Sequence, residues 1–171
     1  VVNFAIISET GYNAYIKLYN PPKQIVYDDI AINTAGTETQ VSEATKTIEE
    51  IRPDDMLAYF VQQAYKLNSS DIHLENQRDD VRVRLRIDGV LHIIATISKE
   101  RYRILLSVIA SAGNISTSEP EAQQGHISQR ITMADGSLVD VNVRLEAVPT
   151  VNGMDVVMRL FNMSAEKYHL D

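Results

Sequence analysis

The sequence contains no cysteine, which excludes disulfide bonds and thiolate metal sites. Its longest apolar runs are only a few residues, far short of the roughly 20 that a helix needs to cross a bilayer. No charged segment followed by an apolar one opens the chain, so nothing indicates a signal for export. We therefore expect a cytoplasmic protein that does not insert directly into a membrane.

Signatures of catalysis are lacking as well. The seven glycines form no glycine-rich loop followed by Lys-Ser or Lys-Thr, so the phosphate-binding P-loop of ATPases is absent. No Gly-x-Ser-x-Gly motif occurs, and the four histidines lie in unlike contexts. We predict no catalytic residue in this chain and expect that it does not hydrolyse ATP alone.

Net charge and hydrophobic content further restrict the class of protein. The 23 acidic and 16 basic residues leave a formal net charge of −7, which argues against a general nucleic-acid partner. Hydrophobic residues make up 44% of the chain, which is enough to bury a core and excludes a disordered protein.

The 171 residues fit one domain of ordinary size with a small additional piece. Residues 1–31 are interpreted as the C-terminal remnant of a preceding N-terminal domain, with a strand at 1–7 and a helix from Ser8 to about Tyr19. Residues 32–51 are rich in Thr and Glu and poor in large apolar residues, which predicts a flexible linker. The main domain then covers residues 52–171.

Hydrophobic periodicity predicts the elements of the main domain. A helix begins near Pro53, where a proline and acids favour the first turn, and ends at Asn68. Ser98 caps a second helix that runs to Ala112. Strands are expected at 70–75, 81–87, 90–97, 125–133, 137–148 and 154–161, with hairpin turns at 88–89 and 135–136. This order predicts an α+β domain: a mainly antiparallel sheet of about six strands with helices packed on one side.

Two successive strands carry charges of opposite sign on one face each, because strand side chains alternate. If these strands pair, acids meet guanidinium groups across the ladder, and each pair contributes roughly 0.2–1 kcal/mol. Such a face either docks a partner or an anionic ligand, or is a solvated surface whose charges neutralise one another. No metal site is predicted, because potential ligands on one strand rarely converge on one ion. The residues of this charged face are Asp71, His73, Glu75, Arg82, Arg84, Arg86 and Asp88.

The segment S-D-I-H-L-E at 70–75, followed by V-R-L-R-I-D-G-V-L at 83–91, closely resembles a signature of the type II secretion and type IV pilus-assembly ATPases. Further along, residues 143–161 resemble the family pattern D-x-R-x-S-x-x-P-T-x-x-G-E-x-x-V-x-R-L-L, with Pro149 and Gly153 at the family's spacing. The resemblance covers about 54–171 and is specific because four short motifs occur in the family's order.

The resemblance implies a non-catalytic domain with a PAS-like fold that precedes the ATPase core of a longer protein. That parent would bind ATP and Mg²⁺ and form a homo-hexamer. The domain would contact the ATPase core, neighbouring subunits and cytoplasmic domains of inner-membrane platform proteins, which places it in the cytoplasm, peripheral to the inner membrane. The domain before it often engages an inner-membrane partner and binds a cyclic dinucleotide in some members.

The resemblance also implies candidate nucleotide contacts. In such motors, arginines of this domain reach nucleotide phosphates and help to sense ATP between subunits, because a guanidinium donates several charge-assisted hydrogen bonds. The match places Arg144 at one such position. The chain departs from the family where His126 replaces an arginine and where Gly153-Met154 replaces Gly-Glu. The candidate nucleotide contacts are Arg144, Arg130 and His126. A histidine is not a permanent cation, so His126 is a poor substitute for arginine, and nucleotide sensing is either reduced or made by Arg130 or Arg144.

A second hypothesis is a stand-alone PAS-like module that senses a ligand or binds a protein. Apolar faces of the sheet and a helix would then line an internal pocket, although a filled core is the commoner arrangement. The residues considered for this lining are Val83, Leu85, Ile87, Leu91, Ile93, Leu105 and Ile109. A third hypothesis, an isolated enzyme, has no constellation of residues to support it.

Overall fold

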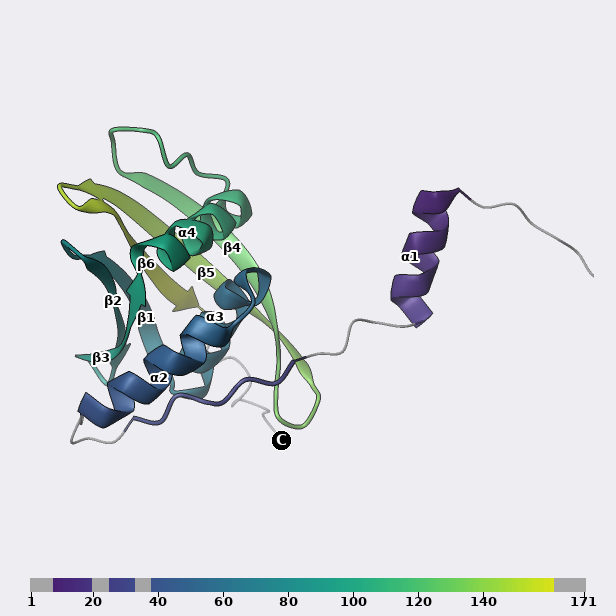
Figure 1. The fold of residues 1–171 in the computed structure, drawn as a ribbon, viewed down its shortest axis with the longest axis horizontal. Coiled ribbons are helices and arrows are strands. Elements are labelled where there is room, and N and C mark those ends of the chain that lie inside the picture. The colour runs from purple at the N-terminus through teal and green to yellow at the C-terminus, as the bar shows by residue number, and fades with distance from the viewer. Residues whose placement is uncertain (1–7, 20–24, 33–37, 162–171) are drawn as a thin grey trace, which may run out of the picture.

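The computed structural model describes residues 8–19, 25–32 and 38–161. These residues form one six-stranded sheet in the order β3-β2-β1-β6-β5-β4, and all neighbouring strands are antiparallel. Helices α2, α3 and α4 lie on one side of the sheet (Figure 1). The predicted α+β class, antiparallel sheet and one-sided helices are therefore confirmed, while the PAS-like description stays a prediction.

Two three-stranded meanders, β1-β2-β3 and β4-β5-β6, join through the pairing of β1 with β6. Both meanders have the tight turns that the sequence predicts, because Asp88, Gly89 and Gly136 adopt positive φ values of 49°, 79° and 82°. The strands are β1 (Ser69–Asn76), β2 (Asp80–Ile87), β3 (Val90–Ser98), β4 (Gln123–Thr132), β5 (Leu138–Thr150) and β6 (Gly153–Phe161).

The helices are α1 (Glu9–Tyr19), α2 (Glu38–Glu50), α3 (Met56–Lys66), which follows the 3₁₀ turn η1 (Pro53–Asp55), and α4 (Lys99–Gly113). The predicted helix near residues 8–19 is confirmed, whereas the predicted strand at 1–7 lies outside the described residues. Ser98 caps α4 as predicted, since its Oγ accepts a hydrogen bond from the Arg101 amide at 3.2 Å. None of the helices described is long and apolar enough to cross a membrane.

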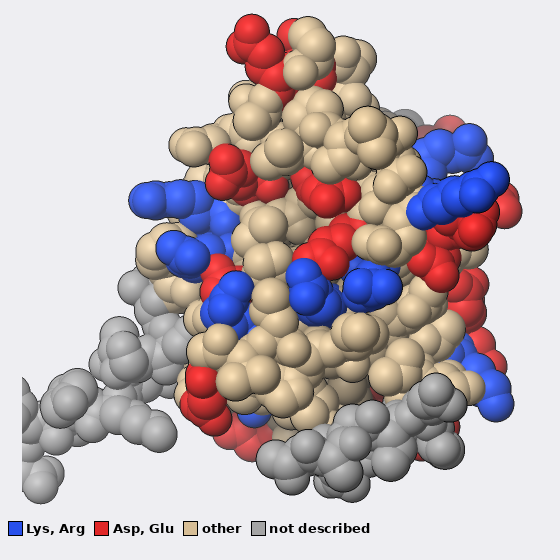
Figure 2. Space-filling view, turned by 90° about the vertical axis from the view of Figure 1, so that its left-hand side faces the viewer, with Lys and Arg blue, Asp and Glu red and all other residues tan. Residues whose placement is uncertain are grey.

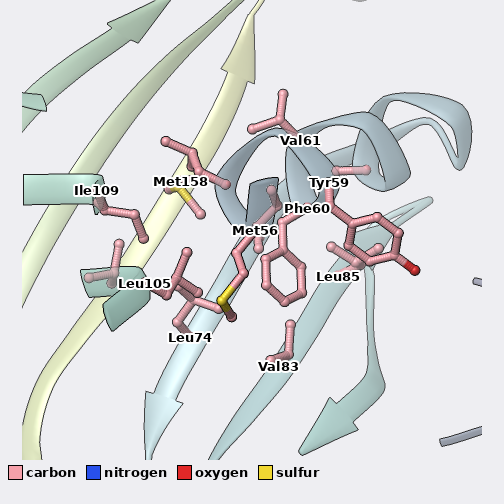
Figure 3. Close-up of a cluster of buried hydrophobic side chains, with 14 of the residues drawn as sticks. Met56, Tyr59, Phe60, Val61, Leu74, Val83, Leu85, Leu105, Ile109 and Met158 are labelled. Atoms are coloured by element: carbon pink, nitrogen blue, oxygen red, sulfur yellow. The ribbon is translucent and has the colours of Figure 1, made fainter. Parts of the chain in front are cut away.

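The core lies between the sheet and the helices, and Phe60 of α3 is at its centre (Figure 3). Burying one such side chain contributes about 1.5–3 kcal/mol. The core members drawn around Phe60 are Met56, Tyr59, Val61, Leu74, Val83, Leu85, Leu105, Ile109 and Met158. Four residues considered for a ligand pocket, Val83, Leu85, Leu105 and Ile109, are thus packed in this core and have no exposed surface.

Strand β3 carries a register shift that changes which of its side chains face the core. Leu91 and Ile93 are the Cα partners of Arg86 and Arg84, so they lie on the face opposite the core. After the irregularity, Ala95 pairs with Val83 and points inward. The expectation that Leu91 and Ile93 share the inner face is therefore wrong, because a one-residue shift exchanges the two faces of a strand.

The prediction of a flexible linker at 32–51 is wrong for its longer part, which forms α2 and packs against β3. Ala44, Ile48 and Ile51 follow a helical spacing and are all buried in the core. The Arg101 guanidinium of α4 donates to the carbonyl oxygens of Ile48, at 2.8 Å, and Ile51. The helix is thus stabilised by contacts that its Thr- and Glu-rich composition does not reveal.

Residues 25–32 also pack on the main domain, although the sequence assigned them to the preceding one. The Ile30 amide donates to Gln63 Oε1 at 2.8 Å, and Lys66 forms an ion pair of 2.8 Å with Asp29. Tyr27 donates its hydroxyl hydrogen to Asp55 at 2.8 Å. The packed unit therefore begins before residue 52, and the origin of residues 1–31 in a preceding domain stays a prediction.

A single lysine connects the two hairpin ends next to the central strands. Lys99 Nζ donates to Asn76 Oδ1 at 3.0 Å and to the carbonyl oxygens of Gln77 and Asn152, at 2.5 and 3.1 Å. Asn76 in turn donates from its Nδ2 to the Met154 carbonyl at 2.5 Å. These bonds tie the β1–β2 turn to the β5–β6 turn and so hold the register of β1 against β6, on which the site described next depends.

Candidate functional site

A row of charged side chains crosses the open face of the sheet, by which we mean the face opposite the helices. From β2 to β4 its members are successive Cα partners: Arg86, Asp71, Arg159, Arg144 and His126. We call these five residues the arginine row. Neighbouring strands lie about 4.8 Å apart, so side chains of adjacent members are within reach of one another. The row thus contains three guanidinium groups and one carboxylate, and two of the three, Arg86 and Arg159, pair with that carboxylate.

Asp71 is the buried centre of the arginine row, with only 4% of its side chain exposed. It accepts hydrogen bonds from Arg159 Nε at 2.9 Å and from Ser70 Oγ at 2.8 Å, and Arg86 Nε lies 3.4 Å away. Burial by itself raises the pKa of this carboxyl, but the hydrogen bonds from Ser70 and Arg159 and the charge of Arg159 together lower it below its ordinary value. Asp71 is therefore a permanent anion at neutral pH.

The ladder of β1 and β2 forms the predicted charged face. Asp71, His73 and Glu75 are the Cα partners of Arg86, Arg84 and Arg82. The second ion pair is diagonal, because Arg84 donates from Nε to Glu75 at 3.1 Å and also from Nη2. No described residue forms an ion pair with Arg82, and Asp88 lies exposed in the turn without one. Within this part of the face, two of the three arginines are paired with acids.

His73 lies between these ion pairs with 14% of its side chain exposed. Its Nδ1 is 4.0 Å from Glu75 Oε1, and its buried Nε2 has no hydrogen-bond partner among the described residues. Burial lowers the pKa of His73, and the neighbouring Asp71 and Glu75 only partly oppose this effect. The imidazole is therefore neutral at pH 7 and forms part of the packing between the charged pairs.

Arg144 differs from the other two arginines of the arginine row. It is exposed, and its Cα partners are Arg159 on one side and His126 on the other. Its guanidinium lies 5.0 Å from the centre of the Phe161 ring, a cation–π contact. No acid among the described residues forms an ion pair with it. Like charges directly across a ladder are destabilising, so this position favours an anion from outside the domain.

The other two predicted nucleotide contacts have different surroundings. Arg130 makes a bidentate pair with Asp140, with distances of 2.8 and 3.1 Å, and is therefore already neutralised. His126 is exposed at the end of the arginine row, beside Arg144. It follows Gly125, where a Cβ would lie 2.5 Å from the Gly113 carbonyl oxygen, so only glycine allows α4 to approach β4 this closely.

Arg159 is the residue of this site that sequence reasoning did not single out. It occurs in the V-V-M-R-L-F segment on the polar side of the alternation, where it also matches the arginine of the family pattern V-x-R-L-L. Its carboxylate partner Asp71 is 88 residues away, and β6 becomes its neighbour only through the β1–β6 pairing. Local pattern predicts that Arg159 is exposed and cannot predict what it contacts.

Charges of opposite sign lie close together on the surface. In the view of Figure 2, basic and acidic side chains lie beside one another rather than in separate areas. Among the described residues, no group of three or more His, Asp or Glu side chains is placed to hold a metal ion. A candidate binding site on this surface is therefore marked by a cation without a neighbouring acid. Among the described residues, the cation of the arginine row without an ion pair is Arg144.

The sequence also matches a known protein family. Residues 47–171 match the model of the family described as type II/IV secretion system protein. The chain belongs to this family. The predicted membership in the type II secretion and type IV pilus ATPases is therefore confirmed, and the match includes all six strands and the whole arginine row.

Curated relatives carry the same family names. The type IV pilus assembly ATPase PilB of Thermus thermophilus is 32% identical over 119 residues, which are 70% of this chain and 13% of that protein. Type II secretion system protein E of Pseudomonas aeruginosa is 30% identical over 146 residues, 82% of this chain and 28% of that protein. Type II secretion system ATPase E of Vibrio cholerae is 34% identical over 109 residues, 63% and 21% of the two chains. The chain thus spans less than a third of the length of these relatives.

Proposed function

We propose that this chain is a non-catalytic module of a hexameric secretion or type IV pilus-assembly ATPase, in which it contributes to nucleotide sensing between subunits. The proposal rests on family membership, on relatives of which the chain spans only a part, and on the absence of a P-loop from its sequence. The parent protein supplies the P-loop and binds ATP and Mg²⁺.

One observation carries the nucleotide-sensing role: the guanidinium of Arg144 is exposed on a rigid strand with no acid to neutralise it among the described residues. The strand fixes the position of the Arg144 Cα, the Phe161 ring contacts its guanidinium, and the fork of N–H donors matches phosphate oxygens. In the hexamer, Arg144 contacts the phosphates of a nucleotide bound at the next subunit. The domain then changes its orientation as a rigid body when the phosphates are released.

The same rigid-body change couples ATP hydrolysis to the machine. The sheet and its three packed helices move as one unit, because the core and the bonds of Lys99 and Arg101 join them. The partners are the ATPase core, neighbouring subunits and cytoplasmic domains of the inner-membrane platform. The protein therefore works in the cytoplasm, peripheral to the inner membrane. A stand-alone ligand sensor has less support, because four of the residues considered for its pocket are buried in the core.

The test is Arg144→Ala in the complete parent protein, measured as steady-state ATP hydrolysis with separate kcat and KM. Losing charge-assisted hydrogen bonds to phosphate should lower kcat/KM about tenfold or more. Arg103→Ala is the matched control, since Arg103 is an exposed arginine of α4 on the helix side. Light scattering verifies that both variants remain hexameric. Unchanged turnover and unchanged ATP affinity in Arg144→Ala would remove this residue from the nucleotide site.

A further inference from the structure

The two end strands of the sheet, β3 and β4, differ in what covers their outer edges. Helix α2 packs against β3, where Thr45 Oγ1 accepts a hydrogen bond from the Thr96 amide at 3.1 Å. Glu49 Oε1 accepts from the Ser98 amide at 3.4 Å. The ladder of β2 and β3 also carries a register irregularity, which interrupts the regular row of backbone groups. The chain therefore covers one edge of its own sheet.

Strand β4 has none of these protections among the described residues. It pairs with β5 without irregularity over its whole length, and it contains no proline or lysine. Its one arginine, Arg130, is already paired with Asp140. Helices α3 and α4 contact β4 from the face under the helices (Figure 1). Edge strands without such protections are templates on which another strand pairs.

The turn after β4 determines which backbone groups of this strand point outward. The Met133 amide donates to the Ser137 carbonyl oxygen at 2.8 Å, so these two residues form a bonded position of the β4–β5 ladder. Bonded and non-bonded positions alternate along an antiparallel ladder. The even-numbered residues of 124–132 therefore direct their N–H and C=O groups away from β5.

Two of the outward carbonyl groups have partners within the chain. The Thr132 carbonyl oxygen accepts from Gln62 Nε2 at 2.5 Å, and that of Arg130 accepts from Gln129 Nε2 at 3.1 Å. Both bonds agree with the alternation. No described residue bonds to the backbone of the remaining outward residues, which are all exposed: Gln124, His126 and Ser128.

We propose that the edge of β4 binds an extended, acidic segment of another protein, which adds one strand to the six-stranded sheet. A row of alternating N–H and C=O groups is complementary to the backbone of a further strand. The charge of the partner follows from His126, the middle residue of the outward stretch, which lies beside Arg144. Arg144 has no ion-pair partner among the described residues. A carboxylate opposite His126 accepts from an imidazole N–H and lies near the charge of Arg144.

This inference goes beyond the proposed function, because it concerns the edge of the sheet and needs no nucleotide. The probe is a peptide of alternating Glu and Val with blocked ends, as long as β4, and calorimetry measures its binding to the 171-residue chain. Methylating every amide nitrogen removes all backbone donors and keeps all carboxylates. Methylating every second nitrogen leaves one edge of the peptide complete.

We expect the fully methylated peptide to bind at least about tenfold more weakly than the other two, because it cannot donate to β4. Equal binding of all three peptides would mean that the carboxylates alone bind to the arginines of the open face. That result would overturn the inference, as would a failure of the unmethylated peptide to bind.

Ser128→Pro tests the same contact from the side of the protein. Proline removes an outward N–H and no bond to β5, whereas Ser128→Ala is the matched control that keeps the N–H. The proline variant should bind the unmethylated peptide about tenfold more weakly or worse, and the alanine variant should bind like wild type. Wild-type affinity in a folded Ser128→Pro would contradict the inference. If circular dichroism shows that Ser128→Pro does not fold, the methylated peptides decide the question.

Two further measurements identify the occupant. A peptide with Lys in place of Glu should bind at least about tenfold more weakly, and equal affinity would contradict an acidic partner. Light scattering of the chain alone should show a monomer. A dimer that Ser128→Pro abolishes would mean that a second copy occupies the edge, which overturns the inference. The proposed function fails separately, because it is tested by ATP turnover of Arg144→Ala in the parent.

Discussion

The two faces of the six-stranded sheet carry side chains of opposite character. The face under the helices is apolar, and its side chains fill a core in which Phe60, Leu74 and Leu85 have no exposed surface. The open face carries the arginine row and the ion pairs of β1 and β2. Apolar burial supplies the stability of a domain, whereas exposed charges contribute little to it and are free to bind partners. The covered face therefore supplies the stability of the domain, and the open face is the one for which we propose a role in recognition.

The largest effect on stability is expected at the centre of the covered face. Phe60→Ala should lower the free energy of unfolding by about 3–5 kcal/mol, because it removes a fully buried ring and leaves a cavity. Guanidinium denaturation of the 171-residue chain measures this change. Phe60→Leu should recover part of it, because less volume is lost. A Phe60→Ala variant with wild-type stability would contradict the core described above.

The next largest effect concerns α2. Ile48→Ala should cost about 2–5 kcal/mol, since Ile48 is fully buried although it lies in a Thr- and Glu-rich segment. Ile93→Ala is the matched control, because Ile93 is 47% exposed on the open face and should change stability little. Equal losses of stability in the two variants would contradict the difference between the two faces. An unchanged stability in Ile48→Ala would support the prediction of a flexible linker.

A smaller effect should appear as pH falls. Because burial holds the pKa of His73 below its ordinary value of about 6.5, the unfolded chain binds this proton more strongly than the folded one. The stabilisation is complete above that ordinary value and is lost as pH falls below it towards the folded pKa. Melting temperatures at pH 7.5 and 5.5 should show a smaller decrease in His73→Gln than in wild type. Identical decreases would mean that His73 titrates like a solvated imidazole.

The smallest effect is expected at an exposed ion pair. Arg130→Ala should leave the melting temperature unchanged within error, because the Arg130 and Asp140 side chains are 65% and 54% exposed and water screens the pair. The same measurement in Asp140→Ala should agree. A decrease comparable to that of Ile48→Ala would show that the open face also determines stability and would contradict the division proposed above.

The local sequence pattern was sufficient to predict most of the helices and strands. The alternation in 81–87 and the turn at Asp88-Gly89 predict β2, its hairpin and the common face of its arginines, and the register confirms each. The same reasoning fails at Leu91 and Ile93, because an irregularity in β3 shifts the alternation by one residue. It fails at α2 as well, where three buried apolar residues at helical spacing are hidden among polar ones.

The sequence by itself determined the class of the fold, the charged strands and the family, because these depend on periodicity, turn residues and short motifs that neighbouring residues encode. Only the tertiary structure decided that β6 pairs with β1 and so brings Arg159 to Asp71 across 88 residues. It also decided that Arg130 pairs with Asp140, whereas no acid among the described residues pairs with Arg144. The reason is physical: whether a charge is paired depends on which strands become neighbours, and that follows from packing of the whole core rather than from local sequence.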